Sequence, residues 1–332
     1  MNVNILLQKN KLFLILCLVI IILIMSAIIS GSIFWIKFLT EMLITGLFAL
    51  SIGLLIEYVG LLSFGHALFF GLGGYILAYL HINSSIPLYI NFLLTVVFSF
   101  GVGLLIGWLC SRLKGVQFAV ATLAFGQLAW TLAVKLRSIT NGEDGMPVTF
   151  SAYPFLNDPP IFLCIVAVIV VFSFFFLCRL VQSPFGYLLR GIKDNQMRVP
   201  FMGFSATYSK TMIFAISGVF ATISGVLQVV LRQFISPDAL SWSTSGTGVV
   251  MAIMGGVGSL IGPLIGAGVF MFIQDWLSSY TDNWMIFIGI LLILVMMFEP
   301  KGLIGVIQKG IVRRSGFLGQ GTELYKWEDA LG

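Results

Sequence analysis

Charged residues are scarce in this chain: Asp, Glu, Lys and Arg together make up 9% of its 332 residues. A soluble domain carries roughly 25%. Hydrophobic residues reach 59% and the mean hydropathy is +1.05. This composition excludes a soluble globule, a nucleic-acid-binding protein and a disordered chain as descriptions of the whole sequence. What remains is an all-α, polytopic helical membrane protein.

Cysteine and histidine are also rare. The two histidines, His66 and His81, have no carboxylate or cysteine at metal-ligand spacing, and no CxxC pair occurs. We therefore expect neither a metal site nor a disulfide framework. All four cysteines lie in apolar runs: Cys17, Cys110, Cys164 and Cys178.

Catalytic and nucleotide-binding motifs are absent from the sequence as well. It contains no G-x-x-x-x-G-K-[ST], no H-E-x-x-H and no G-x-S-x-G. We expect a chain that is not an enzyme and binds no cofactor or ATP of its own. Deep intramembrane charges, which an ion-coupled carrier needs, are few too, so the driving force should come from elsewhere.

Apolar runs long enough to cross a membrane are what the sequence has in abundance. The 36 glycines indicate helices that pack closely. We predict ten membrane segments, at 12–30, 38–57, 61–80, 87–111, 116–136, 161–179, 210–231, 244–257, 260–277 and 284–299. A transmembrane domain would then span 1–310, followed by a polar cytoplasmic tail at 311–332 that is either natural or an added sequence.

Basic residues predict the orientation. The first run follows Lys9 and Lys11 as a signal peptide would, but its length favours a retained span. If both termini are cytoplasmic, fourteen of the 18 lysines and arginines fall in cytoplasmic segments. Basic residues concentrate on that side of membranes. Only four face outward: Lys37, Lys135, Arg137 and Arg232.

Two glycine-rich stretches interrupt the helical pattern. One covers 60–74, and the other breaks 244–277 at Gly255, Gly256, Gly262 and Pro263. Such breaks mark discontinuous helices along transport pathways, although glycines equally serve tight packing. The two stretches could be equivalent parts of a duplicated unit.

One polar segment lies inside the bundle, at 183–210. Ser183 can cap a helix and Pro184 suits its first position. Apolar residues then recur at helical spacing until Pro200. This predicts a short amphipathic cytoplasmic helix, either lying on the lipid surface or docking a partner.

Several stretches, in order, resemble a known family: GLLSFGHALFFGLGGY, GVQFAVATLAFGQLAW, SPFGYLLRGIKDNQ, MAIMGGVGSLIGPLIGA and LLILVMMFEPKGLIG. They are similar to the permease subunits of bacterial branched-chain amino acid ABC importers of the LivM-like type, with urea and short-chain amide permeases as close relatives. The resemblance covers roughly 38–307. It implies a type II (vitamin B12-importer-like) permease fold in the bacterial inner membrane.

The resemblance also implies partners: a second permease subunit, two cytoplasmic ATP-binding subunits and a periplasmic solute-binding protein. The loop at 183–205 corresponds to the coupling helix that docks on the ATPase. Val199-Pro200-Phe201-Met202 departs from the family pattern, so this contact could be individual. The coupling residues carried over by position are Arg190, Ile192, Asp194, Asn195 and Gly203.

An uncharged pathway suits a zwitterion or neutral amide better than a multiply charged ion. Branched-chain amino acids are the expected cargo, with urea or a short-chain amide as the alternative. A channel, a secondary carrier or a membrane scaffold are the competing classes. For His66 a neutral packing role is the favoured alternative, and for Gln127 a bridge between helices is an equal one. The candidate pathway residues are Ser63, His66, Thr122, Gln127 and Ser245.

Overall fold

The computed structural model describes residues 19–84, 86–256 and 259–281, with positions 283, 285–287, 289, 290, 293, 297, 302, 303 and 305. The predicted boundary at 310 and most of the predicted span 284–299 lie outside these residues. The long elements are the helix Val19–Ser30, α2 (Ile33–Val59), α3 (His66–Asn83), α4 (Leu88–Cys110), α5 (Gly115–Lys135), α8 (Pro159–Gln182), α9 (Pro184–Asn195), α10 (Ala206–Arg232), α11 (Trp242–Gly255) and α12 (Gly262–Ser278).

Among the described residues, five helices are long and apolar enough to cross a membrane: α2, α4, α5, α8 and α10. Each coincides with a predicted segment, and the protein is an all-α membrane protein. The helices α3, α11 and α12 also match predicted segments but are shorter, with 18, 14 and 17 residues. The total of ten spans stays a prediction.

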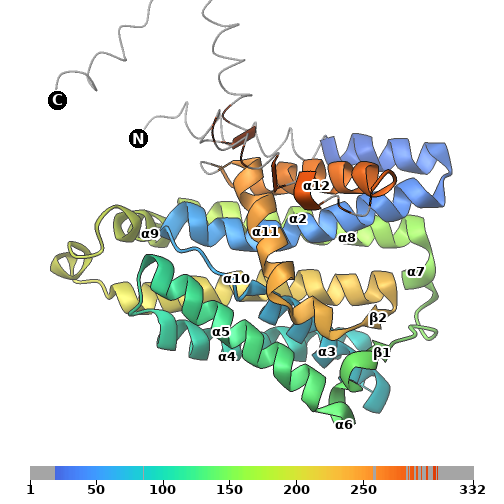
Figure 1. Ribbon diagram of the computed structural model, residues 1–332, viewed down its shortest axis with the longest axis horizontal. Coiled ribbons are helices and arrows are strands. Elements are labelled where there is room, and N and C mark those ends of the chain that lie inside the picture. The colour runs from blue at the N-terminus through green and yellow to red at the C-terminus, as the bar shows by residue number, and fades with distance from the viewer. Residues whose placement is uncertain are drawn as a thin grey trace, which may run out of the picture.

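The helices α2 and α10 form the centre of the bundle. Most of their apolar stretch is buried by other helices, whereas α4 and α5 are buried over only 28% of theirs. In Figure 1, α10 lies between α2 with α8 on one side and α3, α4 and α5 on the other. The outer faces of α4, α5 and α8 present large apolar side chains, as a lipid-facing surface requires.

Glycines let the central helices approach one another closely. A Cβ atom on Gly225 of α10 would overlap the main-chain oxygen of Phe70 on α3, and one on Gly73 of α3 would lie 2.6 Å from the oxygen of Thr222 on α10. On α4, a Cβ at Gly103 would lie 2.8 Å from the Cα of Ala215. These contacts confirm the packing role predicted for the glycines.

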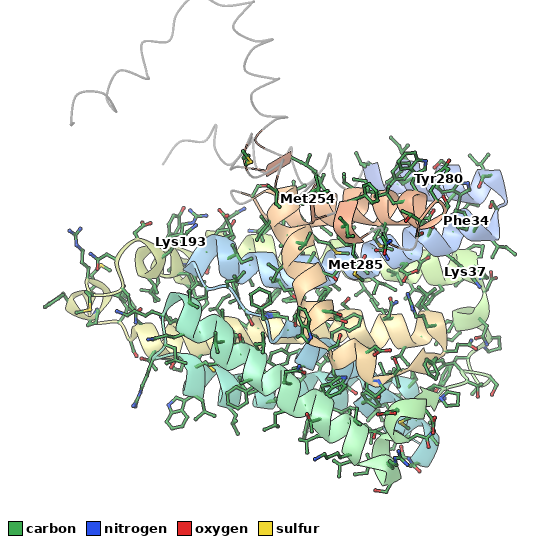
Figure 2. All side chains as sticks on the ribbon, in the orientation of Figure 1. Phe34, Lys37, Lys193, Met254, Tyr280 and Met285 are labelled. Carbon is green, nitrogen blue, oxygen red and sulfur yellow. The ribbon has the colours of Figure 1, made fainter. Side chains whose placement is uncertain are left out.

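The long axis of the molecule has two distinct ends (Figure 1). At one end, the two-residue strands β1 (Met146–Pro147) and β2 (Phe234–Ile235) pair antiparallel, with α6 (Arg137–Thr140), η1 (Gly142–Asp144), α7 (Pro154–Asn157) and η3 (Pro237–Leu240) nearby. At the other end lie α9 and η2 (Val199–Met202). Figure 2 shows Lys193 at the α9 end and Lys37 at the opposite end.

Both glycine-rich stretches are breaks between helices. After α2, Gly60 has a φ of 70°, and the chain stays non-helical until His66. Between α11 and α12 the helix stops at Gly255, where a Cβ would overlap the main-chain oxygen of Gly262. The prediction of interrupted helices is confirmed, although α3 begins five residues later than expected. That the two stretches are equivalent parts of a duplicated unit stays a prediction.

Candidate functional site

The first functional element is α9, a helix of 12 residues formed by local sequence signals. The Ser183 hydroxyl accepts the N–H of Gly186 at 3.4 Å, and Pro184 occupies the first turn. Leu189 and Ile192 are buried, while the opposite face carries exposed polar residues. The predicted amphipathic helix is therefore confirmed, ending at Asn195 before Pro200.

The helix α9 is fastened to the end of α2. The ammonium of Lys193 donates to the main-chain oxygen of Glu57 at 2.7 Å. The guanidinium of Arg190 lies over the buried ring of Tyr58, 5.2 Å from its centroid. Both contacts are made to the last residues of α2, one of the two central helices.

A buried lysine ties the loop after α9 to the bundle. Lys210, near the start of α10, is 3% exposed. Its ammonium donates to the side-chain oxygen of Gln196 at 2.9 Å and to the main-chain oxygen of Leu113 at 3.5 Å. It joins α9, α10 and the connection between α4 and α5 at one point.

The loop beyond α9 presents large apolar side chains to its surroundings. Phe201 is 92% exposed, and its neighbours form what we call the apolar loop surface. Soluble surfaces rarely carry such a patch without a partner. Its members are Met197, Phe201, Met202, Phe204 and Tyr208. Sequence reasoning missed this surface, although it singled out 199–202 as unusual.

The five predicted coupling residues all lie at this end of the molecule. Arg190 and Ile192 face the bundle, and Asp194 and Asn195 are exposed at the end of α9. Gly203 ends η2 with a φ of 80° and has open space around it. The structure brings these residues together on one segment, and their coupling role stays a prediction.

The second functional element is a chain of buried hydrogen bonds at the break between α2 and α3. His66 Nδ1 lies 2.9 Å from Ser63 Oγ, and its Nε2 lies 2.7 Å from Ser217 Oγ. The Ser217 hydroxyl donates to the main-chain oxygen of Ser51 at 2.6 Å. All four residues are fully buried.

This geometry assigns the protons of His66. Since Ser217 uses its proton on Ser51, it must accept from His66 Nε2–H, which leaves Nδ1 to accept the Ser63 proton. Every polar atom of the imidazole is then satisfied in its neutral form. Such a network fixes the non-helical segment 60–65 against α2 and α10.

The other predicted pathway residues surround the same break. The Ser245 hydroxyl on α11 accepts the N–H of Ala67 at 2.8 Å, and a Cβ on Gly65 would overlap the main-chain oxygen of Thr122 on α5. Both side chains are buried. Ser63, His66, Thr122 and Ser245, scattered in the sequence, thus converge on one point. A pathway role for them stays a prediction.

Gln127 differs from these four residues. It lies on α5 beside Gly126, which approaches Gly65, and it is partly buried. Its side-chain oxygen is buried and has no hydrogen-bond partner among the described residues. An unpaired amide oxygen is free to accept a hydrogen bond from a ligand.

Within the described part of the chain, His, Cys, Asp and Glu side chains form no group that could hold a metal ion. The described residues instead form apolar helices, a buried polar network at the break between α2 and α3, and an exposed apolar loop beside α9.

Comparisons with known proteins agree with this description. A family model described as the branched-chain amino acid transport system / permease component matches residues 34–296. The high-affinity branched-chain amino acid transport system permease protein LivM of Salmonella typhimurium is 26% identical, with 93% of this chain and 78% of the relative covered. The protein of the same name from Escherichia coli is 25% identical over the same shares.

A more distant relative comes from Methanocaldococcus jannaschii. Its probable branched-chain amino acid transport permease protein LivM is 23% identical, with 77% of this chain and 89% of the relative covered. No solved structure matches the chain significantly.

Proposed function

The chain belongs to the family of branched-chain amino acid transport permeases, and on that premise we propose that it is the membrane-spanning subunit of an ATP-driven importer. Its cargo would be branched-chain amino acids delivered by a periplasmic binding protein. A second permease subunit and two cytoplasmic ATP-binding subunits complete the proposed assembly. ATP hydrolysis belongs to those partners, and the fold is that of a type II importer permease.

The orientation that we propose places the α9 end in the cytoplasm of a bacterial inner membrane, with both termini on that side. Among the described residues, seven basic side chains gather at this end and four at the β1–β2 end. The excess follows the positive-inside rule. The seven are Arg112, Lys114, Arg179, Arg190, Lys193, Arg198 and Lys210.

The observation that carries the proposed coupling is the apolar loop surface next to α9. A face with Phe201 92% exposed is suited to a groove on a soluble partner, and the ATP-binding subunits are the partners on that side. The bond from Lys193 to Glu57 and the stacking of Arg190 on Tyr58 join this surface to α2. Force applied to the loop therefore reaches the bundle through short contacts.

The proposed movement passes from α2 to the break before α3. The segment 60–65 is a non-helical connection between two long helices with a glycine at each end, so we take it as the hinge between them. The Ser63–His66–Ser217 chain links this hinge to α10. Alternating access would arise when closure of the ATPases shifts α9 and the segment 60–65 bends, which changes the angle between α2 and α3.

The cargo proposal depends on the distribution of charge. Glu57 and Asp275 lie near the ends of α2 and α12, and Glu41 lies eight residues after the start of α2, so none of these carboxylates is at the middle of its helix. Interiors of this kind admit molecules without net charge more readily than ions. Leucine, isoleucine and valine are zwitterions without net charge, and their side chains are apolar.

A test of the coupling proposal uses the complex with its ATP-binding subunits. The variant Gly203→Trp is strained because φ is 80° at that position, and Asp194→Arg combined with Arg190→Glu inverts the charges of α9. Both should lower uptake and the stimulation of ATPase activity while the bundle still folds. Unchanged transport and ATPase stimulation in both variants would reject α9 as the coupling element.

A further inference from the structure

A cavity of about 390 Å³ lies toward the β1–β2 end, between α2, α10, α11 and α12. Sites for small molecules commonly have this size, roughly 300–1,000 Å³. Charged side chains of both signs and buried aromatic side chains line it, and none of the predicted pathway residues does. Its lining includes Glu41, Phe48, Phe70, Arg232, Asp238 and Met251.

Charges of both signs gather at its rim. Arg232, at the end of α10, pairs with Glu41 of α2, and the same carboxylate oxygen accepts the amide N–H of Gln228 at 3.3 Å. The side chain of Arg232 stays 60% exposed, so its other N–H groups remain available. Asp238 lies on the rim with an exposed carboxylate.

One polar atom at this site has no partner. The side-chain oxygen of Gln228 is buried and accepts no hydrogen bond from the described residues. A buried acceptor without a donor costs about 1–3 kcal/mol. A ligand bearing N–H groups, such as an ammonium, could relieve that cost.

The floor of the cavity is apolar. The rings of Phe48 and Phe70 meet there with centroids 5.0 Å apart, and both are buried. Met251 and Met271 add flexible thioether side chains, which adapt to the shape of an apolar ligand. Gly248 packs directly against this floor, since a Cβ atom there would lie 2.5 Å from the ring of Phe48.

From this arrangement we infer that the cavity is an entry site for a zwitterionic α-amino acid with an apolar side chain. Arg232 receives the carboxylate, Glu41, Asp238 and the Gln228 oxygen surround the ammonium, and the side chain rests on Phe48, Phe70 and Met251. The inference rests on the proposed function and adds to it a place where cargo stops after its release.

A phospholipid headgroup with an ammonium and a phosphate carries the same zwitterionic chemistry. The cavity favours the free amino acid. Its apolar residues are gathered at the buried floor, which suits one short apolar side chain, whereas an acyl chain needs an extended apolar surface. The two sources are separated by working in nanodiscs of phosphatidylglycerol, which has no ammonium, with and without phosphatidylethanolamine.

The first experiment measures protection of a cysteine in the full transporter complex. Thr247, which lines the cavity and bonds only within its own helix, is replaced in Thr247→Cys. The matched control is Ser151→Cys, exposed at the same end but outside the cavity. Labelling by N-ethylmaleimide is followed by mass spectrometry of each peptide, so the native cysteines do not interfere.

Leucine in phosphatidylglycerol nanodiscs should slow labelling of Thr247→Cys and leave Ser151→Cys unchanged. Adding Arg232→Gln should raise the leucine concentration needed for half protection about tenfold, the loss expected for a charge-assisted hydrogen bond. Absence of protection, or protection by phosphatidylethanolamine in place of leucine, overturns the inference.

A second set of variants distinguishes a role of the Glu41–Arg232 pair in binding leucine from a purely structural role. If the Glu41–Arg232 pair only holds α2 to α10, the exchanged pair Glu41→Arg with Arg232→Glu should restore wild-type leucine uptake. An entry site predicts that the exchange assembles normally but transports as poorly as Arg232→Gln. Wild-type uptake in the exchanged variant contradicts the site. Loss of leucine uptake by the wild-type complex would instead contradict the proposed function, so the two failures are distinguishable.

Discussion

The ammonium of Lys193 on α9 donates to the main-chain oxygen of Glu57 in the last turn of α2, at 2.7 Å. Carbonyl groups in the last turn of a helix lack partners within the helix, and a cation there is stabilising by about 0.3–1 kcal/mol. The stabilisation is small because the contact is exposed. Its position matters more, since it joins α9 to a central helix next to the break at Gly60.

Replacing Lys193 should therefore weaken coupling more than folding. In Lys193→Met the methylene stem keeps its packing and the donor is lost. We expect ATP-dependent uptake to fall severalfold while the yield and melting temperature of the complex change little. Uptake and ATPase activity measured on the same proteoliposomes give the ratio of transport to hydrolysis.

The control for this variant is Arg198→Met, which removes an exposed basic residue from the same loop. Its ratio of transport to hydrolysis should equal that of the wild type. Equal ratios of transport to hydrolysis in Lys193→Met and Arg198→Met would show that the contact between Lys193 and Glu57 does not couple ATP hydrolysis to transport.

The apolar loop surface predicts a second result. Phe201→Asp places a carboxylate at the most exposed aromatic position of the loop. Burying an unpaired charge at an interface is costly, so the ATP-binding subunits should dissociate during purification. Tyr89→Asp, exposed on α4 far from the loop, should retain them. Retention of the subunits by Phe201→Asp in a pull-down would mean that the loop does not touch them.

The buried His66 network predicts a graded loss of stability. His66→Leu leaves the hydroxyls of Ser63 and Ser217 with fewer partners in a fully buried place, at about 1–3 kcal/mol for each unsatisfied group. His66→Gln keeps one donor and one acceptor and should lose less. Melting temperatures in detergent should fall in the order wild type, Gln, Leu; equal values for the two variants would contradict the assigned hydrogen bonds.

Replacing Gln127 should affect thermal stability in the opposite direction to replacing His66. Because its buried oxygen has no partner among the described residues, Gln127→Leu should keep or raise thermal stability. If the side chain lines the pathway, uptake should nevertheless slow. A lower melting temperature with normal uptake would indicate a bridge between helices instead.

Much of the helix pattern was predictable from the sequence because its signals are local. The start of α9 follows from Ser183 and Pro184, and the break between α11 and α12 from Gly255 and Gly262. The start of α3 was predicted too early. Apolar composition does not distinguish a helix from a non-helical segment whose N–H groups, such as that of Gly65, bond to the Ser63 side chain.

The sites depend on contacts between distant residues, which one sequence does not reveal. His66 and Ser217 are 151 positions apart, and Glu41 and Arg232 are 191 apart. Family resemblance supplied the docking segment but not the exposure of Phe201, because that depends on how the loop leaves α9.

The proposed importer carries branched-chain amino acids across the membrane at the expense of ATP. The most direct test is uptake of radiolabelled leucine into proteoliposomes that contain this permease, its partner permease, the ATP-binding subunits and the binding protein. We expect accumulation of leucine that requires both ATP and the binding protein, with little uptake of a dianion. Leucine uptake by this chain alone without ATP, or robust uptake of a dianion in place of leucine, would contradict this proposal.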